Sequence, residues 1–178
     1  MTTFDFGNGP VPAHQHPNGG GWVADTATVA DRAYVGPDAR VYGNAQVFGN
    51  ALVSDKARVC GDAWVSGDAK VAGNAWVADN ALVFGNACVF HNAWVSGNAE
   101  VYGKARVSGT ALVSGYAQVY DNAWVSGTAL VYGNAQVCSD ARVCSDARVY
   151  GNAEIGDDVK EDMFIEMNGK RYKLVEIE

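Results

Sequence analysis

The chain has 178 residues, of which 48% are hydrophobic and 19% are charged, and its formal net charge at pH 7 is −7. This length and composition predict one domain with a sizeable core. The negative charge argues against a general nucleic-acid-binding surface. There is neither a run of about 18 apolar residues nor a basic leader followed by an apolar stretch, so we expect no membrane span, no signal peptide and a cytoplasmic location.

Residues 1–21 carry no repeat and are dominated by Gly and Pro, so the sequence predicts an irregular N-terminal segment. This segment is either a flexible leader or a cap, in which Phe4, Phe6 and Val11 cover the open start of the region that follows. His14 and His16 have the spacing of a metal-binding pair and are the candidate metal ligands, although we expect no metal.

Residues 22–158 form one uninterrupted six-residue repeat, Val-x-Gly-Asn-Ala-x. An aliphatic residue occupies every sixth position from Val23 to Ile155, and Ala follows four places later from Ala27 to Ala153. Within Ala-x-Val-x, alternate residues point to opposite sides as in a strand, and Gly-Asn is turn chemistry. We therefore expect strands of about four residues that stack on their copies as a parallel solenoid, because this arrangement buries a uniform Val/Ala face better than hairpins do.

The unit Val-Tyr-Gly-Asn-Ala-Gln at 41–46 and its copies resemble the hexapeptide-repeat superfamily, and within it the regular, loop-free repeat proteins of bacteria and their phages. The resemblance implies an all-β fold, a left-handed parallel β-helix of triangular section with three hexads in each coil. Residues 22–158 then make between seven and eight coils. The family contains acyltransferases, γ-class carbonic anhydrases and non-enzymatic structural members, commonly as trimers, so that fold alone does not choose the function.

Residues 159–178 follow the repeat, and in them Asn168-Gly169 separates two apolar-rich runs. Asn-Gly between such runs is a strong signal for a two-residue hairpin turn. The sequence therefore predicts a C-terminal β-hairpin that docks on the last coil or on a neighbouring subunit.

Sorting the hexads by coil places outward side chains in columns, and two columns are apolar or aromatic ladders. We expect these ladders to stabilise themselves by stacking and to form the interface of a parallel homotrimer. The ladder of the first face contains Trp76, Trp94, Leu112 and Leu130, and that of the second face contains Phe84, Tyr102 and Tyr120.

Arg40 and Arg58 fall directly above one another in the same sorting, beside Tyr42. Two like charges in this position repel unless an anion or carboxylate intervenes. Pairing with Asp62 or with solvent is one interpretation. The other is a binding site for a small anionic ligand in clefts between subunits, with Arg40, Arg58 and Tyr42 as its residues.

Four cysteines, Cys60, Cys88, Cys138 and Cys144, never share a column in neighbouring coils. We therefore expect outward-facing free thiols, a reducing compartment and no zinc site.

The absence of an extruded loop favours a non-enzymatic structural or interaction scaffold without a cofactor. The alternative is an acyl-CoA-dependent acyltransferase with His91, the one His of the repeat, as general base. A metal-dependent hydratase similar to the γ-carbonic anhydrases needs three His around one metal, and the family's ligand spacing is absent here.

Overall fold

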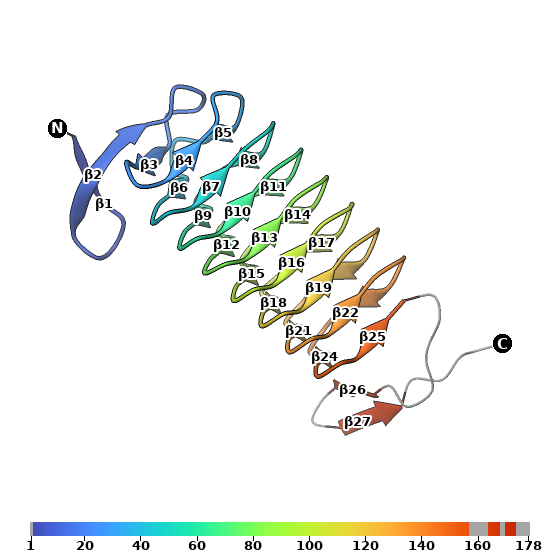
Figure 1. Cartoon of the computed structure of the whole chain (residues 1–178). Coiled ribbons are helices and arrows are strands. Elements are labelled where there is room, and N and C mark those ends of the chain that lie inside the picture. The colour runs from blue at the N-terminus through green and yellow to red at the C-terminus, as the bar shows by residue number, and fades with distance from the viewer. Residues whose placement is uncertain (1, 157–163, 168–169, 174–178) are drawn as a thin grey trace.

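The computed structural model describes residues 2–156, 164–167 and 170–173, and there the chain consists of strands and turns (Figure 1). The repeat winds into a parallel β-solenoid of about seven turns whose three sheets give it a triangular section, which confirms the predicted fold class. Among the described segments no helix is long and apolar enough to cross a membrane.

Three sheets run along the solenoid. The first has 12 strands: β1 (Thr3–Asp5), β2 (Pro10–Gln15), β3 (Trp22–Ala24), β6 (Arg40–Val41), β9 (Arg58–Val59), β12 (Trp76–Val77), β15 (Trp94–Val95), β18 (Leu112–Val113), β21 (Leu130–Val131), β24 (Arg148–Val149), β26 (Phe164–Met167) and β27 (Lys170–Lys173). The second has eight: β4 (Thr28–Val29), β7 (Gln46–Val47), β10 (Trp64–Val65), β13 (Leu82–Val83), β16 (Glu100–Val101), β19 (Gln118–Val119), β22 (Gln136–Val137) and β25 (Glu154–Ile155). The third has seven: β5 (Tyr34–Val35), β8 (Leu52–Val53), β11 (Lys70–Val71), β14 (Cys88–Val89), β17 (Arg106–Val107), β20 (Trp124–Val125) and β23 (Arg142–Val143).

Each strand of the repeat pairs with its copy one coil further on, as in Val41 with Val59. From β4 to β25 the strands have two residues rather than the four that alternation predicts, because the chain bends directly after the residue that follows each Val. The backbone hydrogen bonds nevertheless continue into the turn. Tyr42 N–H donates to the Val59 carbonyl at 3.0 Å, and Asn44 N–H donates to the Gly61 carbonyl at 2.8 Å.

The core is the stack of Val and Ala side chains inside the solenoid. Every Val and Ala of the repeat pattern from Ala33 to Val137 has 0% exposure. The small Ala lies next to each turn and the larger Val lies in mid-strand, so a narrow triangular interior is filled without polar atoms. At the two ends Val29 and Ile155 are only partly buried.

Left-handed backbone at the first turn position explains the Gly of the repeat. Gly67 has φ +71°, and a Cβ there would lie 2.9 Å from the Gly85 carbonyl oxygen of the next coil. Asp replaces Gly at some of these turns and keeps a positive φ, for example Asp79 with φ 58°. Its carboxylate accepts a hydrogen bond from the Gly97 N–H at 3.0 Å, which binds one turn to the next.

The N-terminal segment differs from the sequence prediction. Irregular chain is predicted for residues 1–21, and this is wrong for β1 and β2, which form an antiparallel hairpin that continues the first sheet by pairing β2 with β3. Residues 16–21 then cross the start of the third sheet. There Gly21 N–H donates to the Val35 carbonyl at 2.9 Å, and Val35 N–H donates to the Asn18 carbonyl at 3.0 Å.

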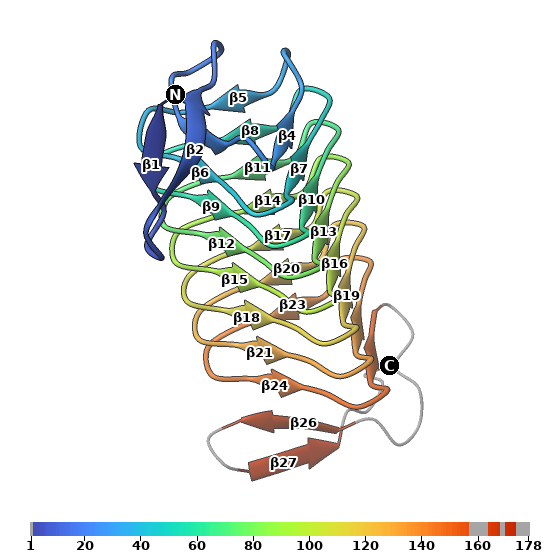
Figure 2. The same ribbon diagram turned by 60° about the vertical axis from the view of Figure 1, so that its left-hand side comes forward.

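The C-terminal hairpin is present. β26 pairs with β27 antiparallel, and Arg148 of β24 pairs with Glu166 of β26. The predicted Asn168-Gly169 turn and the boundary between residues 158 and 159 lie outside the described residues. Both hairpins therefore join the same sheet, one at each end of the solenoid (Figure 2).

Replacing Gly67 by Val should destabilise the fold by roughly 2 kcal/mol, because a β-branched residue is strained at positive φ. Circular dichroism during heating measures the effect as a lower unfolding midpoint. Gly67→Asn is the matched control, since it adds the same Cβ but accepts left-handed backbone. Equal midpoints for the two variants would contradict the conformational explanation.

Candidate ligand-binding site

The N-terminal hairpin lies against the outer face of the first coils (Figure 2). Phe4 stacks on Trp22 with ring centroids 4.5 Å apart, and Phe6 stacks on Tyr42 at 4.9 Å. Phe6 is buried in a small cluster with Ala13 and Ala24. The two Phe side chains thus pack on the outward side chains Trp22 and Tyr42, and Val11 remains 40% exposed. The backbone of β2 covers the edge of the first coil by pairing with β3.

A cavity of about 290 Å³ opens between this hairpin and the first coils. Arg40 of β6 and Arg58 of β9 both line this cavity. The two residues pair directly, as the sorting of the hexads by coil predicts. Each guanidinium lies over an aromatic ring, since Arg40 Cζ is 5.1 Å from the Phe4 centroid and Arg58 Cζ is 5.4 Å from the Trp76 centroid. The full lining consists of Phe4, Trp22, Pro37, Asp38, Arg40, Lys56 and Arg58.

Tyr42, the third predicted ligand residue, lines a different cavity of about 520 Å³ beneath the hairpin turn. That cavity is mainly apolar and also contains Phe6, Val11 and Pro12. The structure therefore brings Arg40 and Arg58 together on one cavity wall and places Tyr42 on the wall of another.

Burial raises the pKa of Tyr42 from 10.0 to about 12, with a hydrogen bond and charge interaction from Cys60 adding to the rise. Arg58 and Arg40 act in the opposite direction, because their charge favours the phenolate. The phenol is thus held neutral and serves as a packing group for Phe6.

Five lining residues of the first cavity are absent from the predicted ligand site, namely Phe4, Trp22, Pro37, Asp38 and Lys56. Phe4 and Trp22 enter the site only because the hairpin folds back, which the repeat does not encode. Lys56 precedes Arg58 by two residues in the sequence. A third positive charge so close to the Arg pair is the signal that could have identified Lys56 as a site residue.

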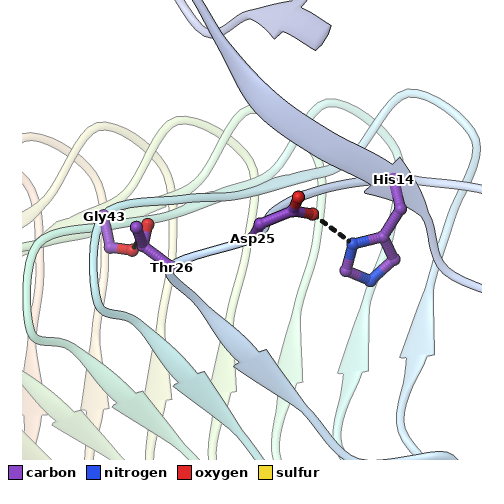
Figure 3. Close-up of polar contacts among 4 residues, drawn as sticks. All are labelled: His14, Asp25, Thr26 and Gly43. Carbon is purple, nitrogen blue, oxygen red and sulfur yellow. Dashed lines mark hydrogen bonds and ion pairs between the residues drawn. The ribbon is translucent and has the colours of Figure 1, made fainter. Parts of the chain in front are cut away.

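The histidines do not assemble into a metal site. His14 forms a 2.9 Å contact with Asp25 through Nδ1 (Figure 3), whereas His16 is buried and its Nδ1 donates to the Asn18 carbonyl at 3.2 Å. Over the described ranges, no three His, Cys, Asp or Glu side chains are grouped so as to hold a metal ion. Thr26, beside Asp25, donates to the Gly43 carbonyl of the next coil.

His91 lies at a turn with φ 61°, and its ring contacts Phe90 edge to face at 4.8 Å. Within the portion of the chain that the structure describes, its imidazole has no ion pair with an acidic side chain. The position is that of a turn residue that tolerates left-handed backbone.

All four cysteines are free, as the sequence predicts. Cys144 is exposed and Cys88 is partly exposed, whereas Cys60 and Cys138 are buried. Larger neighbours cover them, as shown by the Trp76 indole, which donates to the Cys60 sulfur at 2.9 Å.

The two predicted ladders are stacked. Trp76 and Trp94 lie with ring centroids 5.1 Å apart, and Leu112 and Leu130 continue the column in register. On the second sheet Phe84 and Tyr102 stack at 4.9 Å, and Tyr102 and Tyr120 at 5.1 Å, with planes within a few degrees of parallel. Burial raises the pKa of Tyr102, and a hydrogen bond with Cys138 together with burial raises that of Tyr120.

This fold and its side-chain columns define a parallel β-solenoid repeat protein. A family model described as "YdcK Beta solenoid repeat" matches residues 39–55, 45–61 and 117–133. These segments are similar to that repeat. The first contains Arg40 and the second contains Arg58. Searches of curated proteins and of solved structures each returned no match.

Alkaline titration followed by phenolate absorbance should lose one transition with a pKa near 12 in Tyr42→Phe. Because the folded-state pKa of about 12 exceeds the unfolded value of 10.0, the associated stability is complete below pH 10 and is lost as pH rises through 12. Phe6→Ala should lower this pKa by exposing the phenol. An unchanged titration curve in Tyr42→Phe would contradict the assignment.

Proposed function

We propose that this protein is a non-enzymatic structural or interaction scaffold, a rigid β-solenoid that presents aromatic and arginine-bearing faces to copies of itself or to other proteins. The observation that carries the proposal is the pair of stacked ladders on otherwise regular outer faces. Trp94 is 44% exposed. Contiguous apolar columns of this kind on a protein surface mark interaction sites.

The positions of the ladders support a parallel homotrimer. Trp94 opens β15 directly after the turn that leaves the seven-stranded sheet, whereas Tyr102 follows β16 directly before the turn that re-enters it. The ladders therefore border the two corners of that sheet. A three-fold ring joins two different patches, one to each neighbour, and these two corners supply them at overlapping heights.

Trp94→Glu should dissociate the trimer and leave the solenoid folded, because large aromatic residues at the centre of an interface dominate its energy. Light scattering after gel filtration should give three times the 18.8 kDa chain mass for the wild type and the single-chain mass for the variant. Circular dichroism verifies that the variant remains folded.

Trp64→Glu is the matched control. Trp64 precedes a core Val as Trp94 does and is 46% exposed, but it belongs to neither ladder. Its substitution should leave the trimer intact. A wild-type mass of one chain, or a trimer that persists in Trp94→Glu, would overturn this interface.

Membership of the hexapeptide-repeat superfamily and a left-handed coil are part of the same proposal. They are supported by the aliphatic residue and the Ala four places later in every hexad, and by the three sheets of the solenoid. The four free cysteines support a reducing compartment such as the cytoplasm.

Acyl transfer with His91 as base is the alternative that the resemblance offers. His91→Gly should keep or raise the unfolding midpoint, since Gly adopts φ 61° without the cost of about 1 kcal/mol that an L-residue bears there. Thiol release from acyl-CoA should be the same for wild type and variant. Turnover that is present in the wild type and disappears in His91→Gly would establish the enzyme instead.

Binding of a small anionic ligand is a second function that a specific observation favours, namely the cavity lined by Arg40, Lys56 and Arg58. One chain provides all of its walls, so the site does not require the inter-subunit cleft that the sequence analysis assigns to it.

A further inference from the structure

Arg40 and Arg58 are exceptional in the strand ladders. On the seven-stranded sheet, the cations Lys70, Arg106 and Arg142 are separated in register by the neutral residues Cys88 and Trp124. Among the described strand pairs, Arg40 with Arg58 is the one case of two cations paired directly. Stacked strands are about 4.8 Å apart, and like charges at this spacing are unfavourable.

No carboxylate neutralises this pair. Across the described part of the chain, neither guanidinium has a carboxylate oxygen within ion-pair distance. Asp62, the partner that the sequence suggests, accepts a hydrogen bond from the Asn44 side chain at 3.0 Å. Asp38 is the one carboxylate on the cavity wall, which also carries three cations, and among the described residues it forms no ion pair with Arg40 or Arg58.

The aromatic rings hold the guanidiniums without using their N–H groups. Each group makes a cation–π contact, Arg40 with Phe4 and Arg58 with Trp76. Both Arg residues are half-buried. The planar forks are thus fixed in place while their donating edges remain available to a ligand.

We propose that the cavity binds an organic phosphate, with the phosphate group held between Arg40 and Arg58 and contacted by Lys56, and with the organic part against Phe4, Trp22 and Pro37. This inference rests on the proposed anion-binding function and is independent of the scaffold. Two guanidinium forks on adjacent strands and an ammonium group match the several oxygens of a tetrahedral dianion, whereas a planar carboxylate needs only one fork.

The size and surroundings of the site restrict the ligand further. A volume of about 290 Å³ fits a small molecule. The net charge of −7 repels an extended polyanion such as nucleic acid from the rest of the surface. The wall combines the apolar residues Phe4, Trp22 and Pro37 with three cations, which suits a phosphomonoester better than inorganic phosphate.

Isothermal titration calorimetry on the full-length chain, with phenyl phosphate, inorganic phosphate and benzoate as probes, tests the proposal. Phenyl phosphate should bind at least tenfold more tightly than either other probe. Arg40→Gln combined with Arg58→Gln should weaken its binding at least tenfold, and Lys56→Gln should weaken it to a smaller extent.

The matched control is Arg106→Gln combined with Arg142→Gln. These two arginines lie on either side of Trp124 in one column, with their Cζ atoms 5.0 and 6.0 Å from the Trp124 ring centroid. They do not line the cavity. Their loss removes the same charge and the same type of ring contact, so binding should be unchanged. Equal weakening by both double variants would show that net charge, and not the cavity, determines affinity, and would overturn the site.

The remaining outcomes separate the ligand class from the anion-binding function. Inorganic phosphate that binds as tightly as phenyl phosphate, in an Arg-dependent manner, overturns the organic ligand and keeps the anion site. Absence of binding by every probe overturns both. If the Arg40→Gln, Arg58→Gln double variant does not fold, Arg58→Gln alone and Lys56→Gln serve for the binding test.

Without ligand, Arg58→Gln should raise the unfolding midpoint, because it removes the repulsion between the two arginines.

Discussion

A fixed backbone register of 18 residues, in which each residue pairs with its copy one coil later, underlies the solenoid and its side-chain columns. Because the hydrogen bonds of one coil are made to the next, equivalent side chains are placed directly above one another. The register therefore stacks Val on Val in the core, Trp on Trp outside, and Asn on Asn at the turns, where Asn74 donates to Asn92 at 2.9 Å. A one-residue shift would move every Val to the outer surface.

This constraint explains why the solenoid is predictable from the sequence. Val and Ala recur at every sixth position because together they fill the narrow interior, and Gly recurs where left-handed backbone is required. Sorting by coil also places Trp76 next to Trp94 and Arg40 next to Arg58 without reference to a structure.

The N-terminal hairpin does not follow the 18-residue register. Pro10 and Pro12 argue against a strand, yet both occur in β2, where each also pairs with a residue of β1. Gly7 and Gly9, both with positive φ, are the local signal for the turn between β1 and β2. The cavity could not be predicted because its aromatic wall depends on Phe4 folding back onto Trp22, a contact between segments that share no repeat.

The two terminal hairpins also bear on self-association along the long axis. A parallel solenoid exposes at each end a strand that a further coil, including one from another molecule, matches in direction and spacing. In the first sheet β2 and β26 cover those strands and run antiparallel to the stack, and β1 and β27 are the outermost strands. β1 and β27 run in the direction of the stack again, but each belongs to a hairpin that extends the first sheet alone. An incoming coil has to pair with all three sheets at once and meets a hairpin in place of a repeat strand on one of them, so the hairpins oppose end-to-end growth.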